Sequence, residues 1–220
     1  FNHADWITTL YNIYVDCTAV DSKDRNLLIM ASFAYTNTCL TTLYNIYGDK
    51  IDCNAGGQDQ ETPLMIATAD NNITFITTLY NTYGNKVDPN VVDDDGVTAL
   101  EMALDREYFD CAEKILQLFG HKINTNLDKI IFNAVSDCNY DILYLINKYY
   151  HDNIDWNSDF LLENNIILKA VQQNDAQELL TSLHRLWGDK FDTTINICNY
   201  NGDNALMYLV KNNNLPLIKT

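Results

Sequence analysis

Two short patterns of apolar and polar residues alternate along the chain. The first is an aromatic-rich apolar run followed by a small or polar residue, then an apolar residue and Asp or Asn, and Thr41–Asn54 and Thr77–Asn90 are nearly identical copies of it. Six copies lie 33, 36, 36, 31 and 37 residues apart, measured between their small or polar residues. These anchors are Val15, Gly48, Gly84, Gly120, His151 and Gly188. This spacing indicates stacked repeats, in which each unit covers the apolar face of the next.

The second pattern is a short apolar run that lies between the anchors and ends in alanine in most copies. Its alanines keep step with the anchors, and they are Ala31, Ala67, Ala103, Ala134 and Ala170. Each repeat is therefore predicted to hold two short helices. Thr98 is placed to cap a first helix through its side-chain oxygen, and Pro63 is tolerated in a first helical turn. Gly84 or Gly120 is suited to close a second helix in a left-handed conformation.

The aromatic positions of the first pattern predict an outer helix that packs between layers. Leu43, Tyr44, Ile46 and Tyr47 recur in later copies, as expected if each layer presents the same apolar stripe to its neighbours. The alternative is an aromatic platform on which a ligand stacks. Recurrence favours packing, because a binding residue need not be repeated in every layer.

These motifs resemble those of the ankyrin repeat family. Asp93–Leu100 reads DDDGVTAL, which is similar to the family's D-x-x-G-x-T-P-L start, and Thr62–Leu64 reads TPL. Cys111–Phe119 is similar to the second helix, and Asn199–Gly202 to the finger turn. The resemblance covers essentially the whole chain. It implies an all-α solenoid of helix–turn–helix layers with short finger turns: a single segment, residues 1–220, of about six to seven layers, with both ends cut within a repeat.

The repeats depart from the family pattern at their finger turns. Asp24 and Gln60 stand at the position where the family has glycine. The interval from Gly120 to His151 is the shortest, with only INTNLD between one second helix and the next first helix. We therefore expect the finger turn in that interval to be missing or collapsed.

Charge and composition narrow the classes of partner. The chain has 14 Lys and Arg against 30 Asp and Glu, a formal net charge of −16, which disfavours nucleic acid and anionic membranes. No stretch reaches the roughly 18 apolar residues that a membrane-spanning helix needs. The six cysteines are scattered without a C-x-x-C pair, which predicts free thiols rather than zinc or disulfides. We expect a monomer in the cytoplasm, or in the host-cell cytosol for a secreted effector.

No arrangement of residues specifies an enzyme. The four histidines are dispersed, and there is no phosphate-binding loop or nucleophile motif. Asp93–Gly96 resembles the start of a calcium loop, but the twelfth position from Asp93 is Leu104 rather than Glu, so a finger turn is the better interpretation. We expect no catalytic activity, no cofactor and no metal.

The function that these features favour is protein–protein interaction through the concave face of fingers and inner helices. Residues that vary between layers at equivalent positions are the candidates for partner binding, namely Lys23, Arg25, Asp59, Glu61, Asp70, Asp94, Asp95, Asp105, Arg106, Tyr200 and Asp203. The first finger is basic and the middle layers are acidic, which favours a partner with a basic or neutral surface. The acidic candidates are expected on two consecutive layers, at matching offsets from Thr62 and Thr98. A solvated acidic face without a partner is the alternative interpretation.

A second hypothesis makes the chain the targeting arm of a larger secreted effector enzyme whose catalytic domain lies outside this segment. Ile7–Tyr14 reads as a second helix without a first, and the end at Leu215–Ile218 reads as the start of another. The content of Asn, Ile and Tyr resembles that of ankyrin proteins of intracellular bacterial pathogens or protists.

Overall fold

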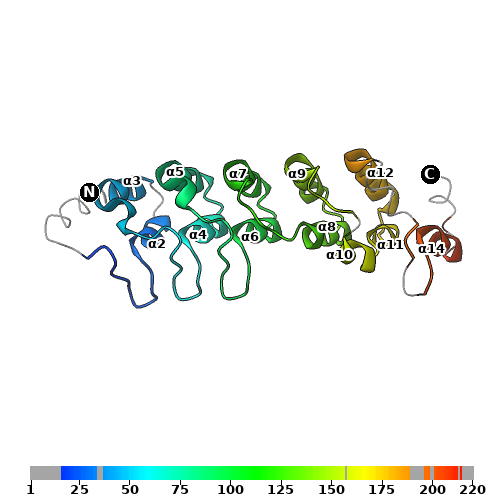
Figure 1. Ribbon diagram of the computed structural model, residues 1–220, viewed down its shortest axis with the longest axis horizontal. Coiled ribbons are helices and arrows are strands. Elements are labelled where there is room, and N and C mark those ends of the chain that lie inside the picture. The colour runs from blue at the N-terminus through cyan, green and yellow to red at the C-terminus, as the bar shows by residue number, and fades with distance from the viewer. Residues whose placement is uncertain are drawn as a thin grey trace. The chain divides into compact units, whose positions relative to one another are not determined.

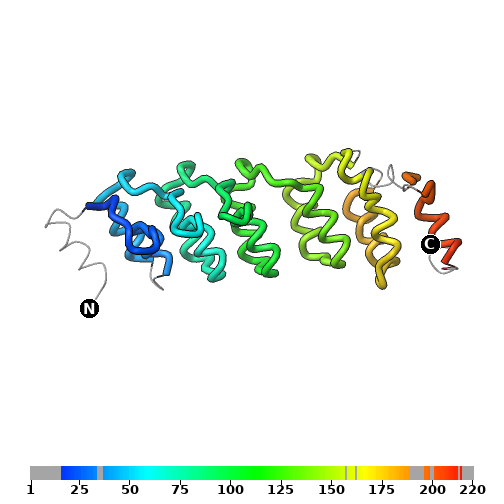
Figure 2. The backbone as a smooth tube through the Cα atoms, turned by 90° about the horizontal axis from the view of Figure 1, so that it is seen from below, coloured from blue at the N-terminus to red at the C-terminus, as the bar shows by residue number. Residues whose placement is uncertain are grey.

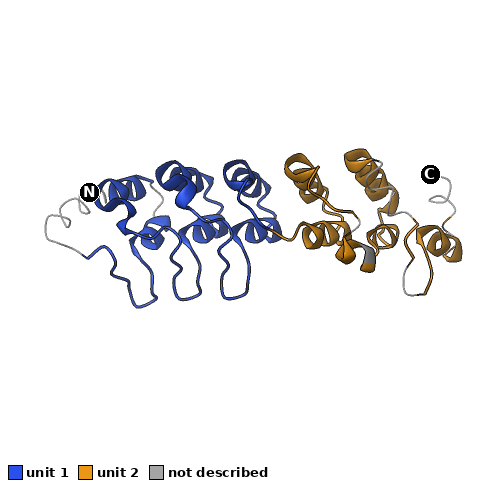
Figure 3. Cartoon of the chain, in the orientation of Figure 1, with its two compact units in different colours: residues 1–124 blue, residues 125–220 orange. Residues whose placement is uncertain are grey.

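The computed structural model consists of helices that form two compact units (Figure 3). Unit 1 comprises residues 1–124 and unit 2 comprises residues 125–220. The structure describes residues 16–33, 37–156, 158–188, 196–198, 201–212 and 214. Across these ranges there is no strand, only an isolated antiparallel bridge between Val92 and Thr98. The predicted all-α class is confirmed. The extent of a single repeat array over residues 1–220 stays a prediction, and each unit is described by itself.

Unit 1, as far as it is described, consists of three helix pairs, each with an inner helix followed by an outer helix. The pairs are α2 (Leu27–Ser32) with α3 (Thr38–Tyr47), α4 (Pro63–Ala69) with α5 (Ile73–Tyr83), and α6 (Ala99–Asp105) with α7 (Phe109–Phe119). The 3₁₀ turns η1 (Gly48–Lys50) and η2 (Gly84–Lys86) follow α3 and α5. Inner helices pack on inner helices and outer helices on outer helices, so the pairs succeed one another as layers (Figures 1 and 2).

Unit 2 repeats this arrangement of inner and outer helices, with a short additional helix in one connection. Its described pairs are α8 (Leu127–Ser136) with α9 (Tyr140–Tyr150) and α11 (Ile166–Val171) with α12 (Ala176–Trp187), followed by the inner helix α14 (Ala205–Lys211). The short helix α10 (Asp159–Glu163) precedes α11 and packs against α8. The outer helix expected at Ile7–Tyr14 and the one expected from Leu215 lie outside the described residues.

The inner helices begin where the sequence provides a side-chain cap. Thr98 Oγ1 accepts a hydrogen bond from the backbone N–H of Glu101 (3.2 Å), and Glu101 Oε2 accepts one from the backbone N–H of Thr98 (3.0 Å). In the preceding layer Thr62 caps α4 in the same way, and the sulfur of Met65 takes the place of the carboxylate. Pro63 stands in the first turn of α4. The predicted cap at Thr98 and the predicted place of Pro63 are confirmed.

The outer helices end in two different ways. Gly84 closes α5 with the positive φ that was predicted, 53°, a value that favours glycine, although its ψ of −128° is not that of a left-handed helix. The same prediction is wrong for Gly120, which has φ −51°. The chain after α7 continues the helical turn there, with the N–H of Gly120 donating to the carbonyl of Leu116 (2.9 Å). A Cβ atom at Gly120 would lie 2.5 Å from that carbonyl oxygen, so close approach rather than positive φ calls for glycine.

The recurring aromatic residues pack between layers. The rings of Tyr44 and Tyr83 meet edge to face with centroids 4.9 Å apart, and those of Tyr80 and Phe119 meet in the same way at 5.2 Å. Each contact joins an outer helix to the next one, and Tyr83 and Phe119 are buried. The interpretation of the aromatic stripe as packing, rather than as a platform for a ligand, is confirmed in unit 1.

An asparagine side chain links each of two consecutive layers in unit 1 to the layer that follows it. Asn54 Nδ2 donates to the carbonyl of Lys86 (2.9 Å), and its Oδ1 accepts from the N–H of Asp88 (2.8 Å). Asn90 repeats both bonds one layer on, with the carbonyl of Lys122 (2.9 Å) and the N–H of Asn124 (2.7 Å). We call this pair of bonds the asparagine clamp. Because one rigid amide holds a donor and an acceptor of the next segment, the clamp fixes how far apart the layers lie.

Asn90→Ala is expected to lower the free energy of unfolding by about 1–3 kcal/mol, because two hydrogen bonds between layers are lost at roughly 0.5–1.5 kcal/mol each. Urea unfolding followed by circular dichroism measures this change. Asn81→Ala is the matched control, since Asn81 is exposed on α5. A loss no larger than that of the control would show that the clamp does not hold the layers together.

Candidate interaction surface

Three finger turns lie side by side in unit 1, at Asp21–Arg25, Gly57–Glu61 and Asp93–Val97 (Figure 1). Each is closed by a hydrogen bond from the N–H of its first residue to the carbonyl of its fifth, at 3.1, 3.2 and 3.1 Å. Neighbouring turns are also joined: the N–H of Gln58 donates to the carbonyl of Lys23 (2.9 Å), and that of Asp94 to the carbonyl of Asp59 (3.3 Å). We call these turns together with α2, α4 and α6 the finger face.

The three turns have the same backbone conformation although their sequences differ. Gly96 has φ 76°, and the equivalent Asp24 and Gln60 have φ 55° and 57°. The prediction that Asp24 and Gln60 occupy the glycine position is therefore confirmed. A left-handed conformation at a residue other than glycine costs about 1–2 kcal/mol, so these two turns are formed at an energetic cost that the surrounding hydrogen bonds offset.

The third finger uses its first carboxylate to stabilise itself. Asp93 Oδ1 accepts hydrogen bonds from the backbone N–H groups of Asp95 (3.0 Å) and Val97 (2.8 Å). This pattern is that of a turn closed by its own aspartate, which confirms the interpretation of Asp93–Gly96 as a finger turn. Nowhere in the described ranges do three or more His, Cys, Asp or Glu residues gather as metal ligands would.

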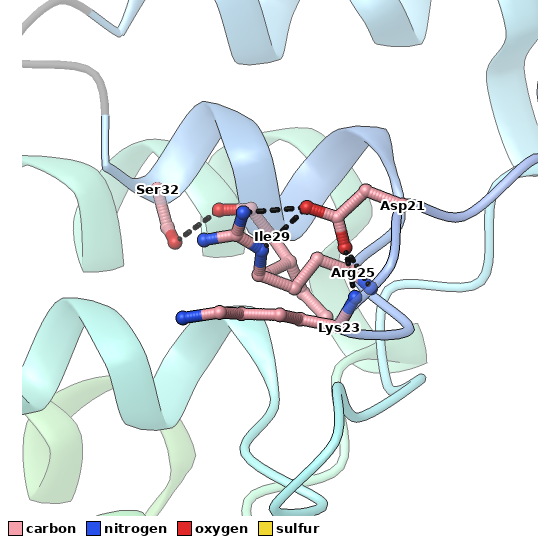
Figure 4. Close-up of polar contacts among 5 residues, drawn as sticks. All are labelled: Asp21, Lys23, Arg25, Ile29 and Ser32. Carbon is pink, nitrogen blue, oxygen red and sulfur yellow. Dashed lines mark hydrogen bonds and ion pairs between the residues drawn. The ribbon is translucent and has the colours of Figure 1, made fainter.

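The first finger is basic, but one of its two cations is already paired. Arg25 Nη2 and Nε donate to Asp21 Oδ2 at 2.5 and 2.8 Å (Figure 4). This guanidinium and the backbone bonds of the turn hold the pKa of Asp21 well below its usual range. Lys23 is exposed, and in Figure 4 its side chain extends away from this ion pair. Of the two predicted basic contacts, Lys23 is the one whose charge the finger leaves available.

Carboxylates from two layers gather around Glu61. Burial raises the pKa of Glu61, and the charges of Asp59 and Asp93 raise it further, while Arg106 opposes them. Asp70 adds a smaller effect in the same direction as the other acids. Asp94 and Asp95 are exposed at the tip of the third finger. The structure therefore places the predicted acidic residues of the second and third fingers next to one another.

The matching offset expected for Asp70 and Asp105 is wrong. Asp70 lies eight residues after Thr62, whereas Asp105 lies seven after Thr98, and one residue turns a helix by about 100°. Asp70 caps the end of α4, and the residue that caps α6 in the same way is Arg106. Arg106 Nη1 reaches back to donate to the carbonyl of Ala69 (2.9 Å). The third layer therefore presents a cation where the second presents an acid.

The finger turns do not continue regularly beyond the third. Residues 120–126 connect α7 to α8 without the five-residue turn, as the short interval predicted. The next connection contains α10, which the sequence analysis missed. Its Phe160 meets Phe132 of α8 edge to face at 5.9 Å, so this part of unit 2 covers its own inner-helix surface. Ser158, which accepts from the N–H of Leu161 (3.3 Å), is the capping signal that the sequence offered.

The last predicted contacts belong to unit 2. Tyr200 lies outside the described residues. Asp203 receives Lys211 Nζ at 2.6 Å on each carboxylate oxygen, which ties the turn before α14 to the end of that helix. In the portion of the chain that the structure describes, no helix has the length and apolar character to cross a membrane.

Comparison with known proteins gives one family and a group of solved structures. The family model described as "Ankyrin repeats (3 copies)" matches residues 11–127. The ankyrin repeat domain of Bcl-3, a member of the IkappaB protein family, is 14% identical over 93% of this chain and 88% of that one, with a TM-score of 0.67. EF0377, an ankyrin repeat protein, is 16% identical over 88% and 94% of the two chains, with a TM-score of 0.61.

A third structure is the predatory endopeptidase Bd0816 of Bdellovibrio bacteriovorus in complex with the immunity protein Bd3460. The matching chain is 19% identical over 91% of this chain and 97% of its own, with a TM-score of 0.54. No curated protein matches the sequence. At these identities the solved structures establish a shared fold.

Glu61→Gln is expected to stabilise unit 1 at neutral pH by less than about 1 kcal/mol, the scale of exposed charge interactions. The folded chain binds the proton of Glu61 more tightly than the unfolded chain, because the folded-state pKa is raised. Ionisation of Glu61 therefore lowers stability as pH rises through that pKa. The stability gained by Glu61→Gln is therefore absent at pH values below the pKa of Glu61 in the unfolded chain, and it is complete at pH values above the pKa of Glu61 in the folded chain.

Thermal unfolding at a series of pH values tests this dependence. Glu163→Gln, at an exposed position on α10, makes the same charge change away from the finger face and is the control. A Glu61→Gln variant that is less stable than the parent protein at neutral pH would contradict the crowding of carboxylates around Glu61.

Proposed function

The chain belongs to the ankyrin repeat family, and we propose that it binds a basic segment of a partner protein on the finger face of unit 1. Ankyrin repeats are in general protein–protein interaction modules, and their fold is in general a scaffold without catalytic activity. One of the similar structures is itself a complex between proteins. The proposal concerns the chemistry of the partner and the surface that receives it.

The observation that carries the proposal is the gathering of like charges on adjacent fingers. Burial is the main cause of the raised pKa of Glu61, and the charges of Asp59 and Asp93 raise it further, so these carboxylates repel one another in the folded protein. The hydrogen bonds that close the turns, and the one between Asp94 and Asp59, are made by backbone atoms. Of these three acidic side chains, only that of Asp93 also helps to form a turn. A basic partner relieves this repulsion, which gives the acidic side chains a function that packing does not.

The other acids on this face add to the same field. Asp94, Asp95 and Asp105 are exposed, and Arg106 is the cation that partly offsets them. Lys23 on the first finger then marks the end of the acidic section, so an extended basic segment is expected to lie over the second and third layers. We expect the protein to act as a monomer in the cytoplasm, which its six free thiols favour.

Simultaneous Asp94→Lys, Asp95→Lys and Asp105→Lys changes are expected to slow the association of a short lysine–glycine peptide by at least about tenfold, because steering between opposite charges is lost. Association of the parent protein is expected to slow as salt is added, since screening acts over about 8–10 Å at physiological ionic strength. Surface binding kinetics at several salt concentrations measure both effects. The thermal midpoint should stay unchanged or rise, because repulsion is removed.

The matched control reverses three exposed acids that lie outside the finger turns, at Glu107, Asp137 and Glu163. It changes the net charge by the same amount, so an equal slowing in both variants would assign the effect to total charge. Unchanged affinity after the triple change on the finger face would place the binding surface elsewhere and sink the proposal.

A further inference from the structure

An open cavity of about 620 Å³ lies in unit 1 where the inner helices α2 and α4 end. Its wall on the α2 side is formed by Ser32, Phe33 and Asn37, and its wall on the α4 side by the turn that leads into α5, with Asp70, Asn71, Asn72 and Thr74. No residue of this turn except Asp70 belongs to the acidic surface described above. The cavity therefore joins one charged group of the finger face to an aromatic wall.

The aromatic wall is open to solvent, with Phe33 47% exposed. The guanidinium carbon of Arg25 lies 5.5 Å from the centre of this ring, a cation–π contact. Arg25 is neutralised by Asp21, so it does not repel a second cation as a lone guanidinium would.

The charged wall is the carboxylate of Asp70. Asp70 is exposed, and its side chain makes no hydrogen bond or ion pair within the described part of the chain, while its backbone N–H closes α4. Arg106 of the next layer donates a hydrogen bond to the carbonyl of Ala69. The carbonyl ends of α2 and α4 add negative partial charge, although α2 and α4 are short.

We infer that this cavity, the Phe33–Asp70 pocket, receives an arginine side chain of the partner. The planar guanidinium stacks on an aromatic ring and presents a fork of donors that matches a carboxylate, so one side chain satisfies both walls. A lysine meets Asp70 but stacks less well on Phe33. An apolar side chain would take water away from Asp70 without replacing its hydrogen bonds, and an acidic one would be repelled.

This inference rests on the proposed function and specifies it, because it names one side chain of the basic partner and its position. It predicts that the partner's basic segment is not uniform. One arginine, next to the end of the acidic section, contributes more to binding than the other cations.

The test uses short lysine–glycine peptides that differ only at a central residue, which is arginine, lysine or citrulline, the neutral isostere of arginine. The arginine peptide is expected to bind the parent protein about tenfold more tightly than the citrulline peptide, the difference typical of one charge-assisted pair of bonds. Asp70→Asn is expected to abolish this preference, and Phe33→Leu is expected to abolish the preference for the arginine peptide over the lysine peptide, because the ring distinguishes a planar guanidinium from an ammonium group. Binding measured by fluorescence anisotropy, with amide shifts of Asn71 and Asn72 recorded by NMR, reports both affinity and location.

Asp105→Asn is the matched control, because it removes an exposed carboxylate from the end of α6, outside the pocket. It should leave the arginine preference intact. Equal affinity for the arginine and citrulline peptides, or a preference that survives both pocket variants, would overturn the inference while peptide binding to the finger face supports the proposed function. Failure of all three peptides to bind would instead contradict the proposed function, and the pocket inference with it. Circular dichroism of both pocket variants confirms that they are folded.

Discussion

The distance between successive layers of unit 1 is set by the asparagine clamp, and the surface described above depends on that distance. Asn54 and Asn90 each hold a donor and an acceptor of the next layer with one planar amide. With the layers held in this register, the fingers come close enough for backbone bonds from Gln58 to Lys23 and from Asp94 to Asp59. Apolar packing of the outer helices supplies stability, but it is not directional, so hydrogen bonds must select the register.

The same register that aligns the fingers also forces their carboxylates together. Side chains at equivalent positions of consecutive layers become neighbours, so an acid that recurs from layer to layer is placed beside its own copy. Burial raises the pKa of Glu61, and the charges of Asp59 in its own finger and Asp93 in the next finger raise it further. Arg106 breaks the repetition and relieves part of the repulsion. Stacking of the layers therefore concentrates the negative charge of a few acidic residues on one part of the surface.

The layers differ in how much of their inner-helix surface is left uncovered. In unit 2 the connection that would hold a finger contains α10, and Phe160 covers Phe132 on the inner helix. In unit 1 the first layer leaves the Phe33 ring open, whereas the equivalent position in the next layer is Ala69. The aligned fingers and the open aromatic ring are thus both features of the first unit.

The repeated helix pairs, the cap at Thr98 and the family could be predicted from the amino-acid sequence, because they depend on interactions between residues close in the chain or on a pattern that repeats, whereas α10 was missed. The cap at Thr98, the place of Pro63 and the position of Asp24 and Gln60 in the finger turns were predicted correctly for this reason. The sequence also indicated which residues differ between layers, and hence which acids come from the fingers. Gly120 was misjudged because its conformation follows from how the chain continues after α7 rather than from its own residue type.

Which of the candidate residues contact one another could be seen only in the folded chain. The pairing of Arg25 with Asp21 and the reach of Arg106 to Ala69 need exact side-chain directions, which a difference of one residue along a helix changes by about 100°. The cavity between Phe33 and Asp70 joins residues that are far apart in the chain, and nothing in the repeat pattern marks it. The residues of each layer can be read from the amino-acid sequence, whereas contacts between layers exist only once the layers are stacked.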